Sequence, residues 1–313
     1  MADRKIIAVM GATGAQGGGL VRSIVADPGG GFAARGVTRD PTSDKAKALA
    51  AAGVEMVAAN SYDVESLKRA FAGAHGIYCV SFFWHTFSAE KEGEEIRNMA
   101  AAAKAARPGH VIWSTLEDTR AYIPQSDDRM PTLQGRYKVA HFDAKGEHDH
   151  VFAELPTTYF LASFYWENFI HFGQGPKPGP DGQLVLSLPI GRSKMAGITA
   201  EDIGRCAYGI FKRGTALAGQ RIGVAGEQLT GDAMAAAFTR HLGRAVRYNP
   251  ISPATYRAFG FPGADDMGNM YQFYDEFAHV VNATRDVSRS RELNPKLQDF
   301  DSWLAANKDA IPL

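Results

Sequence analysis

A glycine-rich turn between an apolar run and a helical stretch constrains the fold of this chain more than any other feature. The apolar run 5–10 leads directly into Gly11-Ala12-Thr13-Gly14-Ala15-Gln16-Gly17, which has GxxGxxG spacing. In such a turn the first glycine permits a tight bend, the second lets the backbone approach a pyrophosphate, and the third lets the helix pack closely on the strand. N–H groups at the helix start then bind the anion. The pattern predicts a dinucleotide-binding βα unit.

The first half of the chain alternates short apolar runs with helical stretches, which is typical of a parallel sheet with crossover helices. The expected strands are 5–10, 33–38, 54–59, 76–81, 110–114 and 157–162. The expected helices are 15–27, 44–52, 64–72, 89–106 and one around 137–152. We therefore predict an α/β fold built on a doubly wound parallel Rossmann sheet.

The character of the sequence changes after residue 162. Three prolines and four glycines fall within 173–182, which predicts a loop and a domain seam. Beyond it, short strands (184–188, 220–224) alternate with helices (201–211, 232–241, 302–307). We expect a Rossmann domain over 1–162 and a smaller α+β lobe over 163–313 on the substrate side, forming a cleft, with some of its segments returning to the Rossmann domain.

Composition excludes several classes of protein. Because 34 Lys+Arg balance 34 Asp+Glu, the formal net charge is zero, which argues against general nucleic-acid binding. The apolar runs are shorter than the roughly 18 residues that indicate a membrane helix, and the run 6–10 is too short for the core of a signal peptide. Cys79 and Cys206 lie among apolar neighbours and are expected to be reduced thiols. We predict a cytoplasmic protein.

The end of the second strand bears on which dinucleotide is bound. An acidic residue there would bind the ribose 2′-hydroxyl, whereas a basic residue accommodates a 2′-phosphate. Thr38 and Arg39 end this strand and offer a hydroxyl and a planar charged fork suited to phosphate, and Lys45 adds a second positive charge. Asp40 keeps the 2′-hydroxyl alternative open, although Asp40-Pro41 is typical of a turn. The pattern favours NADP(H) over NAD(H).

Several longer strings resemble the NmrA-like family, atypical members of the short-chain dehydrogenase/reductase superfamily. They are VMGATGAQGG, VTRDP after the second strand, AHFDAKGE at 140–147, FYWENF at 164–169 and FGFPGADDMGNMYQFY at 259–274. The resemblance spans nearly the whole chain. It implies a Rossmann domain that binds NADP(H) and a smaller lobe that completes a cleft, and it leaves enzymatic competence open.

The resemblance also implies a set of cofactor contacts. It implies that the bridging phosphates contact Gly11, Thr13, Gly14, Gln16 and Gly17. It implies that the 2′-phosphate contacts Arg39 and Lys45, and that residues 60–63 lie near the adenine. The contacts toward the nicotinamide fall on Ser81, Phe82, Phe83, Lys145, Tyr165, Trp166, Glu167 and Asn168. One departure concerns the helix after the fourth strand, where a basic residue of an animal family member aligns with Glu94.

The residues expected at the nicotinamide end depart from ordinary short-chain reductases. Those enzymes use a Tyr and a Lys four residues apart on one helical face, with the phenol as the acid. Here the pair is His141 and Lys145, so the acid is His141, a water or none. Ser114, at the end of the fifth strand, is either a substrate-orienting serine or a hydroxyl that satisfies the strand end. No metal site is predicted, because His148 and His150 point to different sides of a helix.

Two functions follow from these patterns. The missing tyrosine and the resemblance favour an NADP(H)-binding redox sensor, in which cofactor occupancy changes a surface for a regulatory protein partner. The alternative is an NADPH-dependent oxidoreductase that reduces a small apolar carbonyl or quinone. The aromatic residues after the fourth strand would then line the substrate pocket, although packing explains them equally well. A homodimer is left open.

Overall fold

The computed structural model describes residues 4–313 and divides them into two compact units by their internal contacts. The first unit comprises the described residues up to Asp118 together with His141–Leu161 and Ala200–Ile222. The second comprises Thr119–Ala140, Ala162–Thr199 and Gly223–Leu313. Each unit is therefore built from three separate stretches of sequence.

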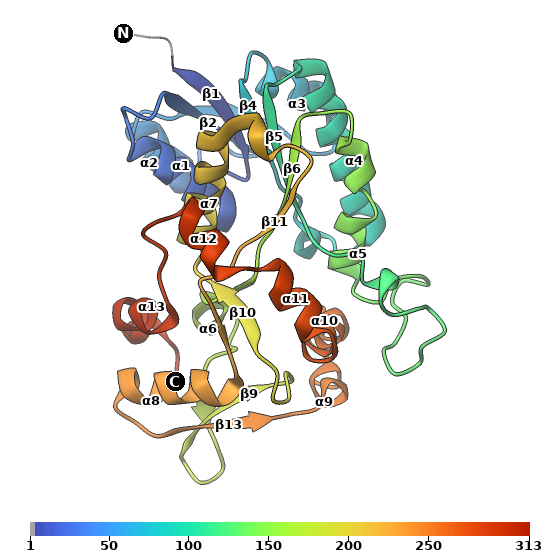
Figure 1. Ribbon diagram of the computed structural model, residues 1–313, viewed down its shortest axis with the longest axis vertical. Helices are drawn as coiled ribbons and strands as arrows, with labels where there is room; N and C mark the ends of the chain where they lie inside the picture. Colours follow the sequence, from blue (N-terminus) through green and yellow to red (C-terminus); the bar gives the residue numbers. More distant parts are fainter. Residues whose placement is uncertain (1–3) are drawn as a thin grey trace. The chain divides into compact units, whose positions relative to one another are not determined.

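A seven-stranded sheet forms the middle of the first unit, in the order β11-β6-β5-β4-β1-β2-β3 (Figure 1). Its strands are β1 (Lys5–Met10), β2 (Phe32–Thr38), β3 (Glu55–Ala58), β4 (Gly76–Cys79), β5 (His110–Thr115), β6 (Thr157–Leu161) and β11 (Arg221–Gly223). Neighbouring strands from β1 to β6 pair in parallel. The strand order reverses between β1 and β4, where doubly wound sheets bind ligands at their carboxyl ends. The predicted fold class is confirmed.

Helices cover both faces of this sheet (Figure 1). On one face α1 (Ala15–Val25) packs against α7 (Ala200–Arg213), and on the other α3 (Val64–Phe71) packs against α4 (Ala89–Ala106). The remaining helix of this half, α2 (Asp44–Ala51), follows β2. Ser43, Asp63 and Ser88 begin α2, α3 and α4, because each side chain accepts a backbone N–H from the first turn.

The predicted helix 137–152 is shorter than expected. The structure has α5 (Ala140–Gly146) followed by a 3₁₀ turn, η3 (Asp149–Phe152), and Tyr137 lies before the helix, bridged to Leu133. The buried Lys138 ammonium donates to the carbonyls of Gln125, Asp127 and Met130 at 3.1, 2.8 and 2.8 Å. Because these bonds hold the preceding segment as a loop, the helix begins only at Ala140.

The second unit has α+β architecture with two three-stranded sheets, β12-β10-β7 and β13-β9-β8. Its strands are β7 (Phe164–Tyr165), β8 (Lys177–Pro178), β9 (Leu184–Leu188), β10 (Met195–Ile198), β12 (Glu227–Leu229) and β13 (Val246–Pro250). Its helices are α6 (Asn168–His171), α8 (Gly231–Leu242), α9 (Pro253–Arg257), α10 (Ala264–Glu276), α11 (Ala278–Thr284), α12 (Val287–Leu293) and α13 (Phe300–Asn307).

Two elements expected in the smaller lobe belong to the first unit. The predicted helix 201–211 is α7, and the predicted strand 220–224 is β11, which lies beside β6 at the edge of the large sheet. Both come after a long excursion of the chain through the second unit. Among the helices of residues 4–313, none combines the length and the apolar composition needed to cross a lipid bilayer.

Candidate functional site

The glycine loop between β1 and α1 forms a backbone cradle at the carboxyl end of the sheet. Gly11 has a φ of +62°, a left-handed conformation that favours glycine. Gly14 is the N-cap residue of α1 and supplies no side-chain cap to its N–H groups. A Cβ atom built on Gly17 would lie 2.5 Å from the carbonyl oxygen of Gly11 and 2.6 Å from that of Met10. Glycine is therefore required where α1 meets the strand, and the open helix start can bind an anion.

Two of the predicted site residues meet beside this loop. Ser114, at the end of β5, donates its hydroxyl to Oε1 of Gln16 at 2.7 Å, and the Tyr78 hydroxyl donates to the same oxygen. The Ser114 side chain is buried. Sequence reasoning did not identify Tyr78, because a tyrosine within a buried strand is expected to belong to the hydrophobic core. These bonds tie α1 to β4 and β5.

Two charged side chains with different surroundings follow β2, the basic Arg39 and the acidic Asp40. The Asp40 carboxylate accepts the Thr42 hydroxyl and amide at 2.6 and 2.8 Å, and these bonds lower the pKa of Asp40 below its ordinary value. Asp40 therefore closes the turn that Asp40-Pro41 predicts. Arg39 is exposed, and its guanidinium lies 2.7 Å from the Nε2 atom of His85. Thr38 accepts the Asp40 amide at 3.4 Å, and Lys45 is exposed in the first turn of α2.

Lys145 lies in a buried polar triangle. Its ammonium donates to Oγ of Ser81 at 2.5 Å and to the Ser81 carbonyl at 3.2 Å, and it forms an ion pair with Oε1 of Glu92 at 2.8 Å. The Ser81 hydroxyl also donates to Glu92, at 2.8 Å. Two predicted residues from different elements, Ser81 and Lys145, are thus brought together.

Glu92, on α4, is the member of the triangle that sequence reasoning missed. Its Oε2 atom is buried and has no hydrogen-bond partner among residues 4–313. The buried face of α4 includes Ala89, Ile96, Met99 and Ala103, and Glu92 falls on the same helical stripe. A charged residue within an otherwise apolar stripe was the available signal. The aligned Glu94, two residues further on, is exposed.

His141 lies one helical turn before Lys145 on α5. That it replaces the tyrosine of ordinary short-chain reductases stays a prediction. The His141 side chain is largely buried, and its ring packs 4.9 Å from that of Trp84 and 5.8 Å from that of Phe83 between ring centroids. The 3₁₀ turn η1 (Phe83–His85) supplies both partners. The imidazole is therefore held by aromatic rings that follow β4.

The aromatic residues after β4 divide into two groups. Phe83 is buried and packs edge-on against Trp84, which is packing rather than pocket lining. Phe82 and Phe87 are 53% and 41% exposed, although large apolar side chains are usually buried. Phe82 also packs edge-on against His85, and Phe87 packs edge-on against Phe83 and Trp84.

The predicted residues of the FYWENF string all lie in the second unit. Trp166 is buried, with its ring 5.4 Å from that of Phe300 and 6.0 Å from that of Trp303. The Glu167 carboxylate accepts the Thr199 hydroxyl at 2.5 Å. Tyr165 ends β7 and Asn168 begins α6. Their expected place beside the nicotinamide stays a prediction.

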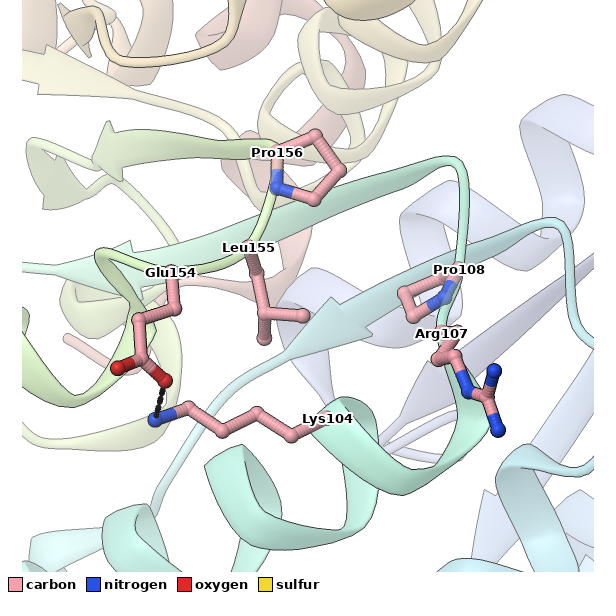
Figure 2. A pocket seen from close by; sticks show the side chains of 6 residues that line it. All are labelled: Lys104, Arg107, Pro108, Glu154, Leu155 and Pro156. Carbon is pink, nitrogen blue, oxygen red and sulfur yellow. Dashed lines mark ion pairs between the residues drawn. The ribbon is translucent and has the colours of Figure 1, made fainter.

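A pocket of about 340 Å³ lies away from the glycine loop (Figure 2). It is lined by Lys104, Arg107, Pro108, Glu154, Leu155 and Pro156. Pro108 and Pro156 precede β5 and β6, so the pocket is at the amino ends of the strands, opposite the cradle. An ion pair of 2.6 Å between Lys104 and Glu154 crosses it.

The histidines after α5 have protein partners. The His148 ring nitrogens contact the Ala144 carbonyl at 2.8 Å and the Arg97 guanidinium at 2.7 Å. His150 contacts the Glu147 carbonyl at 2.8 Å. In the part of the chain that the structure describes, no three His, Cys, Asp or Glu side chains gather as a metal site would require.

Comparison with known proteins identifies the family. The family model of the NmrA-like family matches residues 3–304. The chain belongs to the NmrA-like family. Among curated members, the NmrA-like family domain-containing oxidoreductase FrzB of Cladobotryum sp is 30% identical over 291 residues, which cover 86% of this chain and 83% of that protein. The resemblance predicted from the sequence is confirmed.

Solved structures of NmrA-like and related proteins share the fold. NmrA, a negative transcriptional regulator solved in complex with NADP, superposes with a TM-score of 0.80 at 23% identity, covering 99% of this chain and 98% of that one. The NADPH-dependent quinone oxidoreductase QOR2 of Escherichia coli, solved with NADPH, has a TM-score of 0.70 at 22% identity, covering 97% and 99%.

Proposed function

We propose that this chain binds NADP(H) at the carboxyl edge of the first unit's sheet and acts as an NADPH-dependent oxidoreductase. The observation that carries the proposal is the backbone cradle of Gly11, Gly14 and Gly17. Its third glycine has no room for a side chain, and its helix start has no side-chain cap. A pyrophosphate fits such a cradle because backbone N–H groups and the helix dipole bind anions.

The choice of NADP(H) over NAD(H) rests on Arg39 and Asp40. Arg39 presents an exposed guanidinium just beyond β2, where the adenosine ribose binds in this fold. Asp40, the residue that would favour a free 2′-hydroxyl, accepts both hydrogen bonds from Thr42 at Oδ1 and so closes its own turn. Lys45 adds a second exposed positive charge.

We expect three residues at the nicotinamide half of the cofactor. Ser81 follows β4, and His141 and Lys145 lie on α5. When bound, NADPH supplies a hydride. In this proposal Lys145 exchanges one of its bonds to Ser81 or Glu92 for a ribose hydroxyl, and His141 holds or delivers a proton. The exposed Phe87 suits an apolar carbonyl or quinone.

Oxidation of NADPH by the purified protein tests this proposal. We would follow it against a panel of quinones and α,β-unsaturated aldehydes, with a titration that shows the cofactor site to be occupied. Turnover above the protein-free rate, lost in Gly17→Val, supports the proposal, because the valine side chain would occupy the contact between α1 and β1. An occupied site without turnover on any member of the panel argues against it.

A redox sensor is the second candidate, favoured by the replacement of the tyrosine by a largely buried histidine. A sensor requires that NADPH bind two conformations with different affinity. Limited proteolysis and the oligomeric state, each measured with and without NADPH, test this requirement. A changed cleavage pattern or mass without turnover would favour the sensor, and identical results would argue against it.

A further inference from the structure

Arg39 meets a second basic side chain at the carboxyl edge of the sheet. Its guanidinium lies 2.7 Å from the Nε2 atom of His85. We propose that His85 is a second ligand of the 2′-phosphate of NADP(H) and thereby contributes to the selection of NADP(H) over NAD(H). This inference rests on the proposed function, because it requires that Arg39 bind the 2′-phosphate.

The position of His85 follows from the sheet order. Arg39 comes directly after β2, and His85 ends η1, which follows β4. Both strands are neighbours of β1, and their carboxyl ends lie on the same edge of the sheet. A phosphate held by Arg39 therefore lies within reach of His85. The sequence gives no hint of this, because 46 residues separate the two side chains.

The imidazole is accessible and oriented. Arg39 and His85 are both exposed, so an anion can reach them from solvent. The ring of His85 packs edge-on against that of Phe82 at 4.6 Å between centroids, and its Nε2 atom contacts the Arg39 guanidinium.

The charges at this contact favour an anion. A neutral imidazole can accept a hydrogen bond from the Arg39 guanidinium, whereas a protonated one would be repelled by it. The neighbouring carboxylate, Asp40, is held by Thr42 in its own turn. A phosphate that replaces this contact would accept hydrogen bonds from both side chains.

Titration calorimetry with two cofactor fragments tests the inference without any catalysis. Adenosine 2′,5′-bisphosphate carries the 2′-phosphate, and adenosine 5′-monophosphate (AMP) is the same molecule without it. We expect His85→Asn to weaken binding of the bisphosphate about fivefold and to leave binding of AMP unchanged.

A matched variant separates the outcomes. His150→Asn changes an exposed histidine elsewhere in the first unit and should leave binding of both ligands unaffected. Unchanged affinity for the bisphosphate in His85→Asn, or an equal loss of affinity for AMP, would overturn the role of His85. If the wild type does not prefer the bisphosphate to AMP, the proposed NADP(H) site fails as well.

Discussion

Gly19 on α1 and Gly204 on α7 are in direct backbone contact: a Cβ atom built on Gly204 would lie 2.1 Å from the carbonyl carbon of Gly19. Backbone on both sides of the contact cannot rotate away, so the two helices would have to separate. We expect Gly204→Ala to lower the free energy of unfolding by about 3 kcal/mol, at the upper end of the usual cost of overpacking. Urea denaturation of the purified variant measures this change.

Gly29→Ala is the control for this prediction. Among the described residues 4–313, and apart from its two chain neighbours, no heavy atom lies within 4 Å of a Cβ added to Gly29, and its φ is not positive. The substitution should change the free energy of unfolding by no more than about 1 kcal/mol. Equal free energies of unfolding for Gly204→Ala and Gly29→Ala would show that the close contact between α1 and α7 does not limit the stability of the fold.

The elements that could be predicted from the sequence are those fixed by local patterns. β1 matches its predicted bounds, because its apolar run ends at a glycine turn. α4 also matches its predicted bounds, because Ser88 caps the start of a long helix. The start of α5 could not be predicted, because Lys138 bonds to carbonyls of the preceding loop, 8 to 13 residues before it, and no local pattern marks these bonds. β7, with two residues, is too short to show periodicity. The return of α7 to the first unit depends on a contact between two glycines that no pattern marks.

The candidate site also contains residues that local sequence patterns predict and residues that they do not. The glycine loop and Arg39 were predicted because each follows a strand in a fixed local relation to it. Glu92 and His85 were not, because their partners Lys145 and Arg39 come from other elements. Whether a charged residue on a helix faces a buried lysine or solvent depends on packing, which the sequence does not display.

Substitution of Arg39 tests the cofactor preference. Arg39→Ala removes an exposed guanidinium from the expected position of the 2′-phosphate, so we expect NADPH binding to weaken by about 1.5 to 3 kcal/mol. NADH lacks this phosphate, and its affinity should be nearly unchanged. Calorimetric or fluorescence titration of both cofactors measures the difference.

Arg69→Ala is a suitable comparison, because Arg69 belongs to the last turn of α3, away from the carboxyl edge of the sheet. It should bind both cofactors as the wild type does. Equal losses for NADPH and NADH in Arg39→Ala would refute the assignment of Arg39 to the 2′-phosphate.

His141→Ala tests the proton donor of the proposed reductase. Loss of a positioned general acid typically costs 10²- to 10⁴-fold in rate, so turnover should fall by about 100-fold or more while NADPH affinity stays within about twofold. His141→Phe, which keeps an aromatic ring against Trp84, separates packing from proton transfer. Recovery of turnover in His141→Phe would remove His141 from the chemistry and leave it a packing role.

His110 makes the stability of the protein depend on pH. It is 2% exposed at the start of β5, its Nε2 atom lies 2.8 Å from the Thr158 hydroxyl, and its Nδ1 atom has no hydrogen-bond partner among residues 4–313. Burial lowers its pKa from 6.5 to about 4. The unfolded chain therefore binds a proton at a higher pH than the folded protein, and stability is lost as the pH falls from 6.5 to 4.

The expected loss from this one group is about 3 kcal/mol between pH 7 and pH 4. His110→Gln should remove it, because glutamine does not titrate, even though the lost packing against Phe211 lowers stability at every pH. The difference between the free energies of unfolding of the wild type and of His110→Gln should therefore decrease by about 3 kcal/mol as the pH falls from 7 to 4. Urea denaturation at several pH values measures both curves. Parallel curves would show that His110 is already protonated in the folded protein or that water reaches its Nδ1 atom.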